Sequence, residues 1–369
     1  MKKILAWAVI AALLLSGCGQ LVPARSTHPT ETTAPAATTT PESTQPQVEE
    51  TEAPTEPPKV YFNPLNGKIL DEPYTGRVMA LSINNLAHAL PHYGTNKADI
   101  VMEMWVNGSI IRDLALFTDT SELSQIGSIR SDRMMFNQIL SHYDAILFDA
   151  GGDQRVLAQA REWGLDRFNI YADTNAPTYY SYRDLSREFM FKVSDKYEHC
   201  LFADGRALTE LAQNQGFRTT QDPEKDYFLR FVDEGTPADG ETANQITVTF
   251  TYKGSKKATT MVYNPELDKY VYNQYEKEMV DGTTGEPEAF NNVIVMLADI
   301  TTQVVFHVAD FEAGGTGYFA CGGKLVPITW KAEEGSPFQF FTADGQPLNL
   351  NRGNTYIAIA PNGSPVEYS

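Results

Sequence analysis

Three arginines lie close together in a stretch of the chain that is otherwise strongly apolar. Arg112 interrupts a run of hydrophobic residues, and Arg130 and Arg133 flank a Ser-Asp pair directly before a segment with helical periodicity. A guanidinium presents several N–H donors in a planar fork that matches carboxylate and phosphate groups. The free N–H groups of a helix N-terminus add positive potential. These three arginines are therefore candidates for binding a phosphate or a carboxylate.

Four carboxylates could support such a site. Asp99 and Glu103 are four residues apart in a predicted strand, so they share a face and could orient the arginines from behind a bound anion. Asp149 and Asp153 enclose Ala-Gly-Gly at a strand-to-helix junction, where glycines allow close approach of a ligand. Two alternatives stay open: a tight turn with Asp153 as the helix cap, and a structural network in which the arginines pair with Asp99, Glu103 and Asp132.

Motifs of well-known enzyme classes are absent from the sequence. It has no Gly-x-Ser-x-Gly elbow, no P-loop, no His-Glu-x-x-His and no Cys-x-x-Cys. His88 and His92 are four residues apart, but Pro91 breaks the helix that would align them on a metal ion. His199 and Cys200 are adjacent, so their side chains diverge in a strand or a helix. No metal or cofactor is predicted, catalytic residues are unknown, and whether the protein is an enzyme stays open.

Segments of alternating strand and helix character surround these residues. Continuous apolar runs predict buried strands, and amphipathic segments with caps predict helices. The predicted strands cover residues 77–83, 100–106, 110–117 and 144–150, and the predicted helices cover residues 131–142, 153–163 and 207–215. This alternation predicts an α/β sandwich with a parallel or mixed sheet at residues 60–220. Such folds place their sites at the carboxyl ends of strands.

The pattern changes to a period of two residues in the second half of the chain. Apolar and polar residues alternate from Ile246 to Lys253, and short strands flank turn sequences at residues 264–268 and 321–323. A β-rich, mostly antiparallel domain is therefore predicted at residues 221–369. Its aromatic residues either pack in the core or form a platform on which sugars stack. They are Tyr318, Phe319, Trp330, Phe338, Phe340, Phe341 and Tyr356.

The N-terminal residues predict export and a lipid anchor. Two lysines precede an apolar run that is too short to span a membrane, and Leu15-Ser16-Gly17-Cys18 follows it. This motif resembles a bacterial lipobox. The resemblance implies a signal peptide at residues 1–17 and lipid chains such as palmitate on Cys18. Residues 18–59 are poor in apolar side chains and predict a disordered Thr/Pro/Glu-rich stalk. The expected location is the extracytoplasmic face of the cell membrane.

Charge and cysteine content limit the partners. The chain carries a formal net charge of −18, which argues against nucleic acid because nucleic-acid phosphates would be repelled. The expected partners are the membrane, through the lipid, and a cell-envelope component or protein. Cys200 and Cys321 could form a disulfide in an exported protein or remain as two buried thiols.

Several segments occur in an order that is typical of one protein family. They are residues 81–85, 94–103, 126–133, 143–152, 291–295, 315–318, 324–330, 344–348 and 351–355. Together they resemble the YerB-type lipoproteins, which are exported proteins of Gram-positive bacteria with two domains of unknown function. The resemblance covers nearly the whole body and implies no particular reaction. Family members usually have an acidic residue at the position of Asn84, so this departure argues against a metal ligand or a base there.

These observations favour a binding or scaffold role at the cell envelope. The alternative is an envelope enzyme that acts on a phosphate-bearing or glycan substrate held by the arginines. A nucleophile and its base need not be neighbours in sequence, so the missing motifs favour binding without excluding catalysis.

Overall fold

In the computed structural model, strands from both halves of the chain contribute to one unit at residues 58–369. The residues that the structure describes are 59–171, 177–184, 198–227, 229–237, 239–333 and 335–369. The predicted signal peptide, Cys18 and the predicted stalk up to residue 58 lie outside the described residues. Among the helices that are described, none is both long and apolar enough to cross a membrane.

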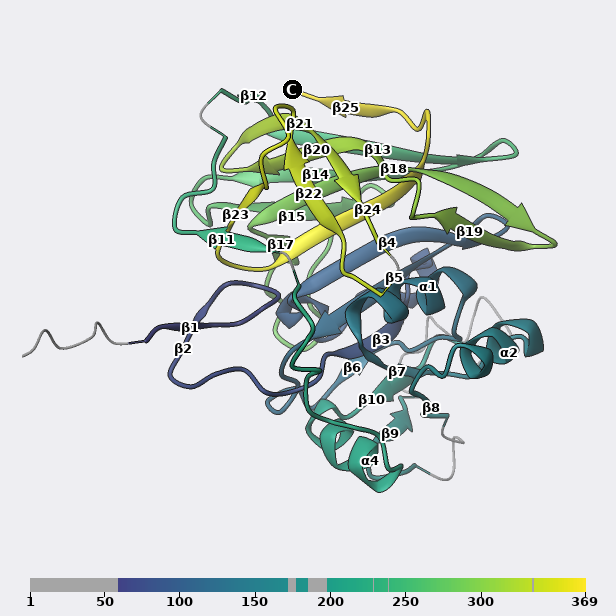
Figure 1. Cartoon of the computed structure of the whole chain (residues 1–369). Helices are drawn as coiled ribbons and strands as arrows, with labels where there is room; N and C mark the ends of the chain where they lie inside the picture. The colour runs from purple at the N-terminus through teal and green to yellow at the C-terminus, as the bar shows by residue number, and fades with distance from the viewer. Residues whose placement is uncertain (1–58, 172–176, 185–197, 228, 238, 334) are drawn as a thin grey trace, which may run out of the picture. The chain divides into compact units, whose positions relative to one another are not determined.

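A sheet of 12 strands forms the core of this unit (Figure 1). Ten of its strands follow one another in the order β12 (Glu241–Thr242), β21 (Lys324–Lys331), β20 (Gly315–Cys321), β18 (Asn292–Gln303), β19 (Phe306–Asp310), β4 (Ile100–Asn107), β5 (Ile110–Phe117), β3 (Met79–Asn84), β7 (Ile146–Asp149) and β8 (Arg167–Asn169). The other two are β22 (Gln339–Thr342), which pairs with β21, and β24 (Thr355–Pro361). Both faces of β3, β4, β5 and β7 are buried, which explains their continuous apolar sequences.

Strands from both halves of the chain share this sheet. β24, near the C-terminus, pairs in parallel with β18 on one side and with β4 on the other, so Thr355 lies opposite Ile100. The predicted boundary between residues 220 and 221 marks a change of pattern along the chain, and the sheet continues across it. The two halves are therefore packed as one unit.

A second, antiparallel sheet covers one face of the large sheet. It consists of β16 (Lys277–Glu278), β15 (Lys269–Gln274), β14 (Ser255–Asn264), β13 (Gln245–Tyr252) and β25 (Val366–Tyr368), with β17 (Ala289–Phe290) beside β15. Ile246, Val248 and Phe250 of β13 are buried in the core between the sheets, as the period of two predicted. The C-terminal half is thus β-rich and mostly antiparallel, which confirms that prediction.

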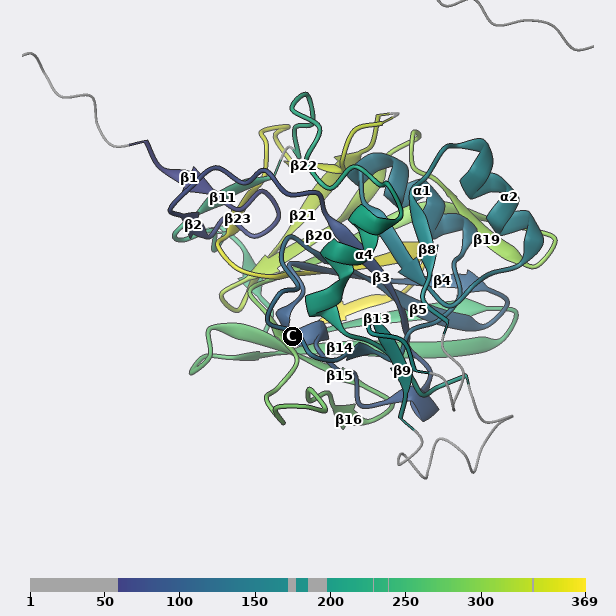
Figure 2. The same cartoon turned by 90° about the horizontal axis from the view of Figure 1, so that it is seen from below.

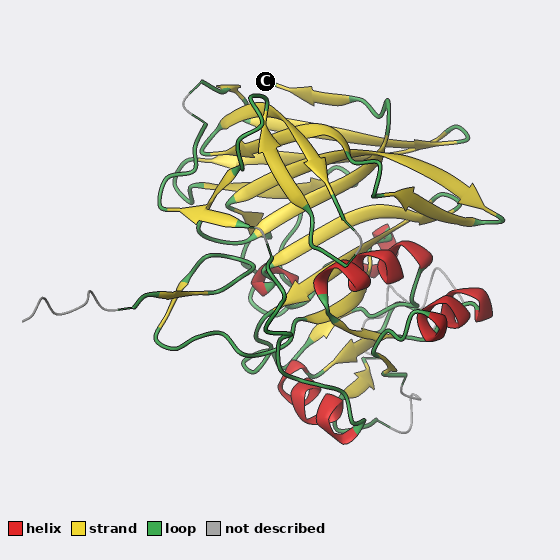
Figure 3. Cartoon of the chain, viewed as in Figure 1, coloured by secondary structure: helices red, strands yellow, loops and turns green. Residues whose placement is uncertain are grey.

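Helices gather around the N-terminal strands (Figure 3). They are α1 (Met134–Tyr143), α2 (Gln154–Glu162), α4 (Leu208–Asn214) and the 3-10 turns η1 (Ala87–Ala89), η2 (Thr95–Lys97) and η3 (Gly205–Ala207). Phe136, Ile139 and Leu140 of α1 pack against the other face of the large sheet. Short strands complete the unit (Figure 1): β6 (Ile126–Gly127), β10 (Leu201–Ala203) and β9 (Ser181–Arg183); β1 (Tyr61–Phe62) and β2 (Ile69–Leu70); β11 (Arg230–Val232) and β23 (Asn349–Asn351).

The predicted α/β sandwich is not present as a separate body. The strands of residues 60–220 belong to the shared sheet, in which β3, β7 and β8 run parallel while β4 and β5 are antiparallel. The helix predicted from residue 131 begins at Met134. The predicted turns at residues 264–268 and 321–323 are confirmed as hairpins, and the predicted strands at residues 100–106 and 110–117 form another hairpin around Asn107-Gly108.

The two cysteines of the body do not form a disulfide. Cys200 and Cys321 are both free and buried. Burial raises the pKa of the Cys321 thiol to about 12, because an apolar environment disfavours the thiolate. Of the two alternatives drawn from the sequence, the buried thiols are correct.

Candidate functional site

The carboxyl ends of the parallel strands β3, β7 and β8 meet at one edge of the large sheet. Residues 128–132 cross this edge just before α1, and backbone hydrogen bonds fix them to both neighbouring strand ends. These bonds run from Asn84 N to Ser128 O (2.9 Å), from Arg130 N to Ser82 O (2.8 Å), from Ala150 N to Arg130 O (3.0 Å) and from Asp132 N to Gly151 O (2.8 Å). The arginines of this segment are therefore held in place by the sheet, and these bonds keep residues 131–133 out of α1.

Arg112 and Arg133 converge on the backbone carbonyl of Ser131. Their Nη1 atoms lie 2.6 Å and 3.3 Å from this oxygen. Arg112 reaches it because β5 begins at this edge, where Arg112 lies opposite Asn84 of β3. Arg130 is close enough for its charge to lower the pKa of both other arginines. The structure thus brings together the three arginines that the sequence singled out.

The arginine cluster has more N–H donors than the surrounding protein satisfies. The Nε atoms of Arg112, Arg130 and Arg133 are buried and have no hydrogen-bond partner within the described part of the chain. Arg133 is the N-cap residue of α1, and no side chain caps this helix end. A buried donor without a partner costs about 1–3 kcal/mol. This geometry therefore suits a bound anion, which would accept from several of these donors at once.

Burial and mutual repulsion oppose the charged forms of these arginines. Burial lowers the pKa of Arg112 well below its usual range, and the charges of Arg133 and Arg130 lower it further. Burial, followed by the charge of Arg130, lowers the pKa of Arg133 to about 10. Burial also lowers the pKa of nearby His199 to about 4, again with a contribution from Arg130. The three arginines thus repel one another, and the charges of Glu198, Asp132 and Asp149 offset this repulsion in part.

A small cavity opens beside Arg130. Its volume is about 170 Å³. It is lined by Ile129, Arg130, Ala150, Tyr171, Arg183, Glu198 and Leu201. Arg183 adds a fourth guanidinium, whose charge also lowers the pKa of Arg130. Glu198 Oε2 lies 2.7 Å from Arg130 Nη2 and is the nearest counter-charge, but its side chain is 52% exposed. Solvent weakens such a pair, so much of the positive charge remains.

Asp149 and Asp153 have partners outside the arginine cluster. Asp149 forms a two-pronged pair with Arg167, in which Nε and Oδ2 are 2.9 Å apart. Asp153 caps α2 by accepting a hydrogen bond of 2.9 Å from Arg155 N. The turn-and-cap alternative is therefore correct for Asp153. Asp149 still contributes negative charge near Arg133.

Asp99 and Glu103 do not orient the arginines as the sequence suggested. Asp99 accepts hydrogen bonds from Thr118 N (2.6 Å) and Thr118 Oγ1 (2.7 Å). Glu103 is bound by residues of the second sheet and β24. Alternation along β4 correctly predicts a shared face for the two carboxylates, but it does not say which other strands cover that face.

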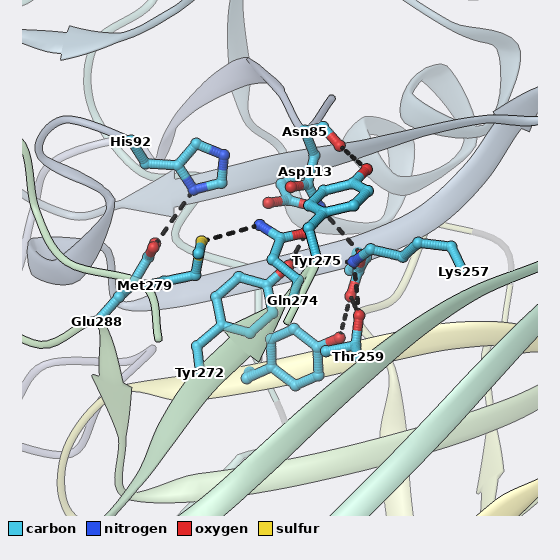
Figure 4. Close-up of polar contacts among 12 residues, drawn as sticks. Asn85, His92, Asp113, Lys257, Thr259, Tyr272, Gln274, Tyr275, Met279 and Glu288 are labelled. Atoms are coloured by element: carbon cyan, nitrogen blue, oxygen red, sulfur yellow. Dashed lines mark hydrogen bonds and ion pairs between the residues drawn. The ribbon is translucent and has the colours of Figure 1, made fainter. Parts of the chain in front are cut away.

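Figure 4 shows a second polar cluster, which includes Lys257 and Thr259 of the second sheet. Glu103 of β4 belongs to this buried cluster. It accepts a hydrogen bond of 2.7 Å from Thr259 Oγ1 of β14, and others from Lys257 Nζ of β14 and Tyr356 OH of β24. Glu103 is fully buried and Lys257 is 9% exposed. A carboxylate from one half of the chain is therefore neutralised by the other half.

The same enclosed cluster contains further buried acids. Asn85 Nδ2 lies 3.0 Å from Glu103 Oε1 and 2.8 Å from Asp113 Oδ1. His92 Nδ1 lies 3.3 Å from Glu288 Oε2. Within the described ranges, no three His, Cys, Asp or Glu side chains are arranged to hold a metal ion. We interpret this cluster as a buried connection between the two sheets.

The buried carboxyl group of Asp113 should make the stability of the protein depend on pH in an unusual way. Burial raises its pKa well above the usual range, and the charge of Glu103 raises it further. Between the unfolded and folded pKa values, the native state holds a proton that the unfolded state lacks. Asp113 therefore contributes stability below its unfolded pKa of about 4, and this contribution is lost as the pH rises through the folded pKa.

Asp113→Asn should remove this loss. Its free energy of unfolding should match that of the wild type near pH 4 and exceed it progressively above pH 5, by up to about 1.4 kcal/mol per pH unit. Urea unfolding at several pH values measures the difference. A difference that does not change with pH would show that Asp113 is ionised in the native protein.

The aromatic residues considered as a sugar platform are mostly core residues. Phe319, Trp330, Phe338 and Tyr356 are at most 2% exposed. Lys257 was not among the residues predicted from the sequence. The period of two residues in β14 could have identified it, because Lys257, Thr259 and Met261 alternate on the buried face of that strand.

Comparisons with known proteins agree with this architecture. Models of a protein of unknown function, DUF3048, match as its N-terminal domain at residues 65–218 and its C-terminal domain at residues 246–357. "Putative lipoprotein YerB" of Bacillus subtilis (strain 168) is 27% identical over 312 residues, which are 81% of this chain and 86% of the relative. The crystal structure of the YerB protein from Bacillus subtilis is similar with a TM-score of 0.69 and 23% identity, and covers 83% of this chain and 99% of that one.

Proposed function

The chain belongs to the DUF3048 family, whose function is unknown. For this member of the family, we propose that it binds a phosphate- or carboxylate-bearing component of the cell envelope. The binding site is the cluster of Arg112, Arg130 and Arg133 at the N-terminus of α1. Its role is that of a binding protein or scaffold. One observation carries the proposal: the buried guanidiniums of Arg112 and Arg133 and the partly exposed guanidinium of Arg130 meet at an uncapped helix end, and their Nε donors have no partner within the described part of the chain.

The groups around the cluster favour binding over catalysis. The arginines offer N–H donors, which stabilise an anion without reacting with it. His199 is the nearby candidate for a general base. Its pKa of about 4 makes it neutral and only weakly basic at neutral pH, and its Nδ1 lies 2.7 Å from Asn84 Nδ2. An enzyme would need a stronger base at this position.

Anchoring completes the proposal. A relative that carries the name of a lipoprotein supports membrane attachment, and we assign the anchor to Cys18 and the body to the extracytoplasmic face. Cys18→Ala should leave the body folded and release it from the membrane fraction, because two acyl chains are needed for stable anchoring. Immunoblots of membrane and soluble fractions measure this. Membrane association that is unchanged in the variant would exclude Cys18 as the anchor.

Calorimetric titration of the detergent-extracted protein with inorganic phosphate tests the binding site. Wild-type protein should bind phosphate, and Arg130→Gln with Arg133→Gln should weaken binding by at least about tenfold per arginine, since a charge-assisted hydrogen bond contributes about 1.5–3 kcal/mol. The matched control is Arg155→Gln with Arg206→Gln, which removes the same charge from two exposed arginines paired with Asp153 and Asp204.

Two outcomes would contradict this assignment. Equal loss of binding in both double variants would show that net charge alone attracts phosphate. A large drop in the melting temperature of the Arg130/Arg133 variant would show that the cluster is structural.

A further inference from the structure

A groove separate from the arginine cluster lies between α1, α2 and the β18–β19 hairpin. Figures 1 and 2 both place β19 beside these helices. The cavity of about 700 Å³ is lined by Gln138, Ser141, His142, Gln159, Trp163, Thr301, Gln303, Val308, Ala309, Asp310, Phe311, Glu312 and Gly335. This volume lies within the range of about 300–1,000 Å³ that is typical of ligand sites. We propose that the α1–α2–β19 groove binds a neutral saccharide.

Trp163 supplies an exposed aromatic surface to the groove. It follows α2 directly and is 45% exposed. The other tryptophans of the described chain, Trp105 and Trp330, are 1% and 2% exposed. An indole has a large apolar face and one N–H donor, so it can stack on the apolar face of a sugar ring while its N–H meets water or a hydroxyl.

Hydrogen-bonding side chains surround this aromatic surface. Thr301, Gln303 and Glu312 line the groove with exposed polar side chains. Asp310 Oδ1 accepts a hydrogen bond of 3.0 Å from Ala313 N. Gln138 is already occupied by the backbone of Ala309, at 2.7 Å and 3.2 Å, and this fixes β19 against α1. The groove thus combines a fixed contact between β19 and α1 with exposed hydrogen-bond donors and acceptors, which can bind the hydroxyl groups of a saccharide.

The charge of the groove disfavours phosphate and carboxylate anions, which are the ligands proposed for the arginine cluster. Among the described residues, its lining holds Asp310 and Glu312 and no lysine or arginine. Lys225 lies close by, since its Nζ donates to Gly335 O. Burial, with a contribution from the charge of Lys225, lowers the pKa of His142, so this side chain is neutral at neutral pH. Two carboxylates against one nearby lysine disfavour an anion. A cationic ligand would favour an aromatic cage, and Trp163 is the one strongly exposed aromatic side chain of the lining. A neutral, hydroxyl-rich ligand fits best.

Tryptophan fluorescence tests this proposal in the processed protein extracted from membranes, because Trp163 is the exposed indole of the described body. Triacetylchitotriose and cellotriose are the probes. At least one should shift the emission to shorter wavelength and protect it from quenching by acrylamide, with a midpoint at millimolar concentration. Trp163→Ala should abolish both effects and weaken calorimetric binding at least tenfold, whereas Trp163→Phe should keep most of the calorimetric affinity.

The matched control is Tyr179→Ala, which removes an aromatic side chain that is 54% exposed outside the groove. It should bind the probes as the wild type does. Failure of both trisaccharides to protect Trp163 would overturn the proposal, and so would protection by choline at the same concentration instead. Equal binding by Trp163→Ala would place the saccharide elsewhere. Phosphate binding by the arginine cluster should be unchanged in Trp163→Ala, so the two sites can fail independently.

Discussion

Lys257→Met is expected to lower the free energy of unfolding by about 3–5 kcal/mol. Lys257 is the cation that neutralises the fully buried Glu103, and its Nζ also lies 2.6 Å from Thr259 Oγ1. Removing one partner of a buried ion pair leaves the other charge uncompensated in a medium of low dielectric constant. Thr259 and Tyr356 would still donate to Glu103, but hydroxyl groups do not replace a positive charge. Urea unfolding at neutral pH measures the loss.

Two further variants make this result specific. Lys331→Met removes the lysine of an exposed pair with Glu333, whose side chains are 47% and 62% exposed, and should cost less than about 1 kcal/mol. Adding Glu103→Gln to Lys257→Met should restore part of the loss, because no buried charge would remain. A loss below about 1 kcal/mol for Lys257→Met would contradict the assignment of Lys257 as the cation that stabilises buried Glu103.

Arg112→Met is expected to have the opposite effect on the unliganded protein. Arg112 is 1% exposed, has an unpartnered Nε and is repelled by Arg133 and Arg130. Replacing a buried, uncompensated charge by an apolar side chain is often neutral or stabilising. We therefore expect the melting temperature without anion to stay the same or rise. In the wild type, phosphate at 100 times its Kd should stabilise the folded protein by about 2.7 kcal/mol. This stabilisation should disappear in Arg112→Met.

Arg167→Met is the matched comparison for Arg112→Met. Arg167 lies at the same sheet edge, but it is the partner of the fully buried Asp149. Its loss should destabilise the protein while leaving the anion donors of the cluster in place. Thermal unfolding with and without phosphate distinguishes the two variants. Strong destabilisation by Arg112→Met would show that this arginine holds the fold together.

The sequence could predict that the three arginines lie close together because the signals are local. Arg130 and Arg133 are close in sequence and precede a helix, and Arg112 breaks a strand that must be buried. The partners of Asp99 and Glu103 could not be predicted in the same way. They depend on β14 and β24, which are distant in sequence and meet β4 only in the folded protein. Alternation identifies a face, and long-range pairing decides what covers it.

The sheet shared by the two halves of the chain could not be predicted either, because it also depends on pairing between distant segments. The period-two pattern after Ile246 identifies antiparallel strands, and those hairpins are present. The parallel pairing of β24 with β4 leaves no local pattern, because a buried apolar strand such as Thr355–Pro361 fits any position within a sheet. The start of α1 also depended on distant contacts, since backbone bonds to β3 and β7 keep residues 131–133 extended.

The binding of an anion at the arginine cluster is tested most directly by anomalous diffraction from crystals grown with selenate. We predict a selenium peak beside Arg112 and Arg133, with selenate oxygens about 2.7–3.2 Å from their guanidinium nitrogens and from the first N–H groups of α1. The peak should be absent in crystals of Arg130→Gln with Arg133→Gln. Selenate that is ordered only elsewhere in the wild-type crystal, or Nε donors of the cluster bound to protein groups, would contradict the proposed function.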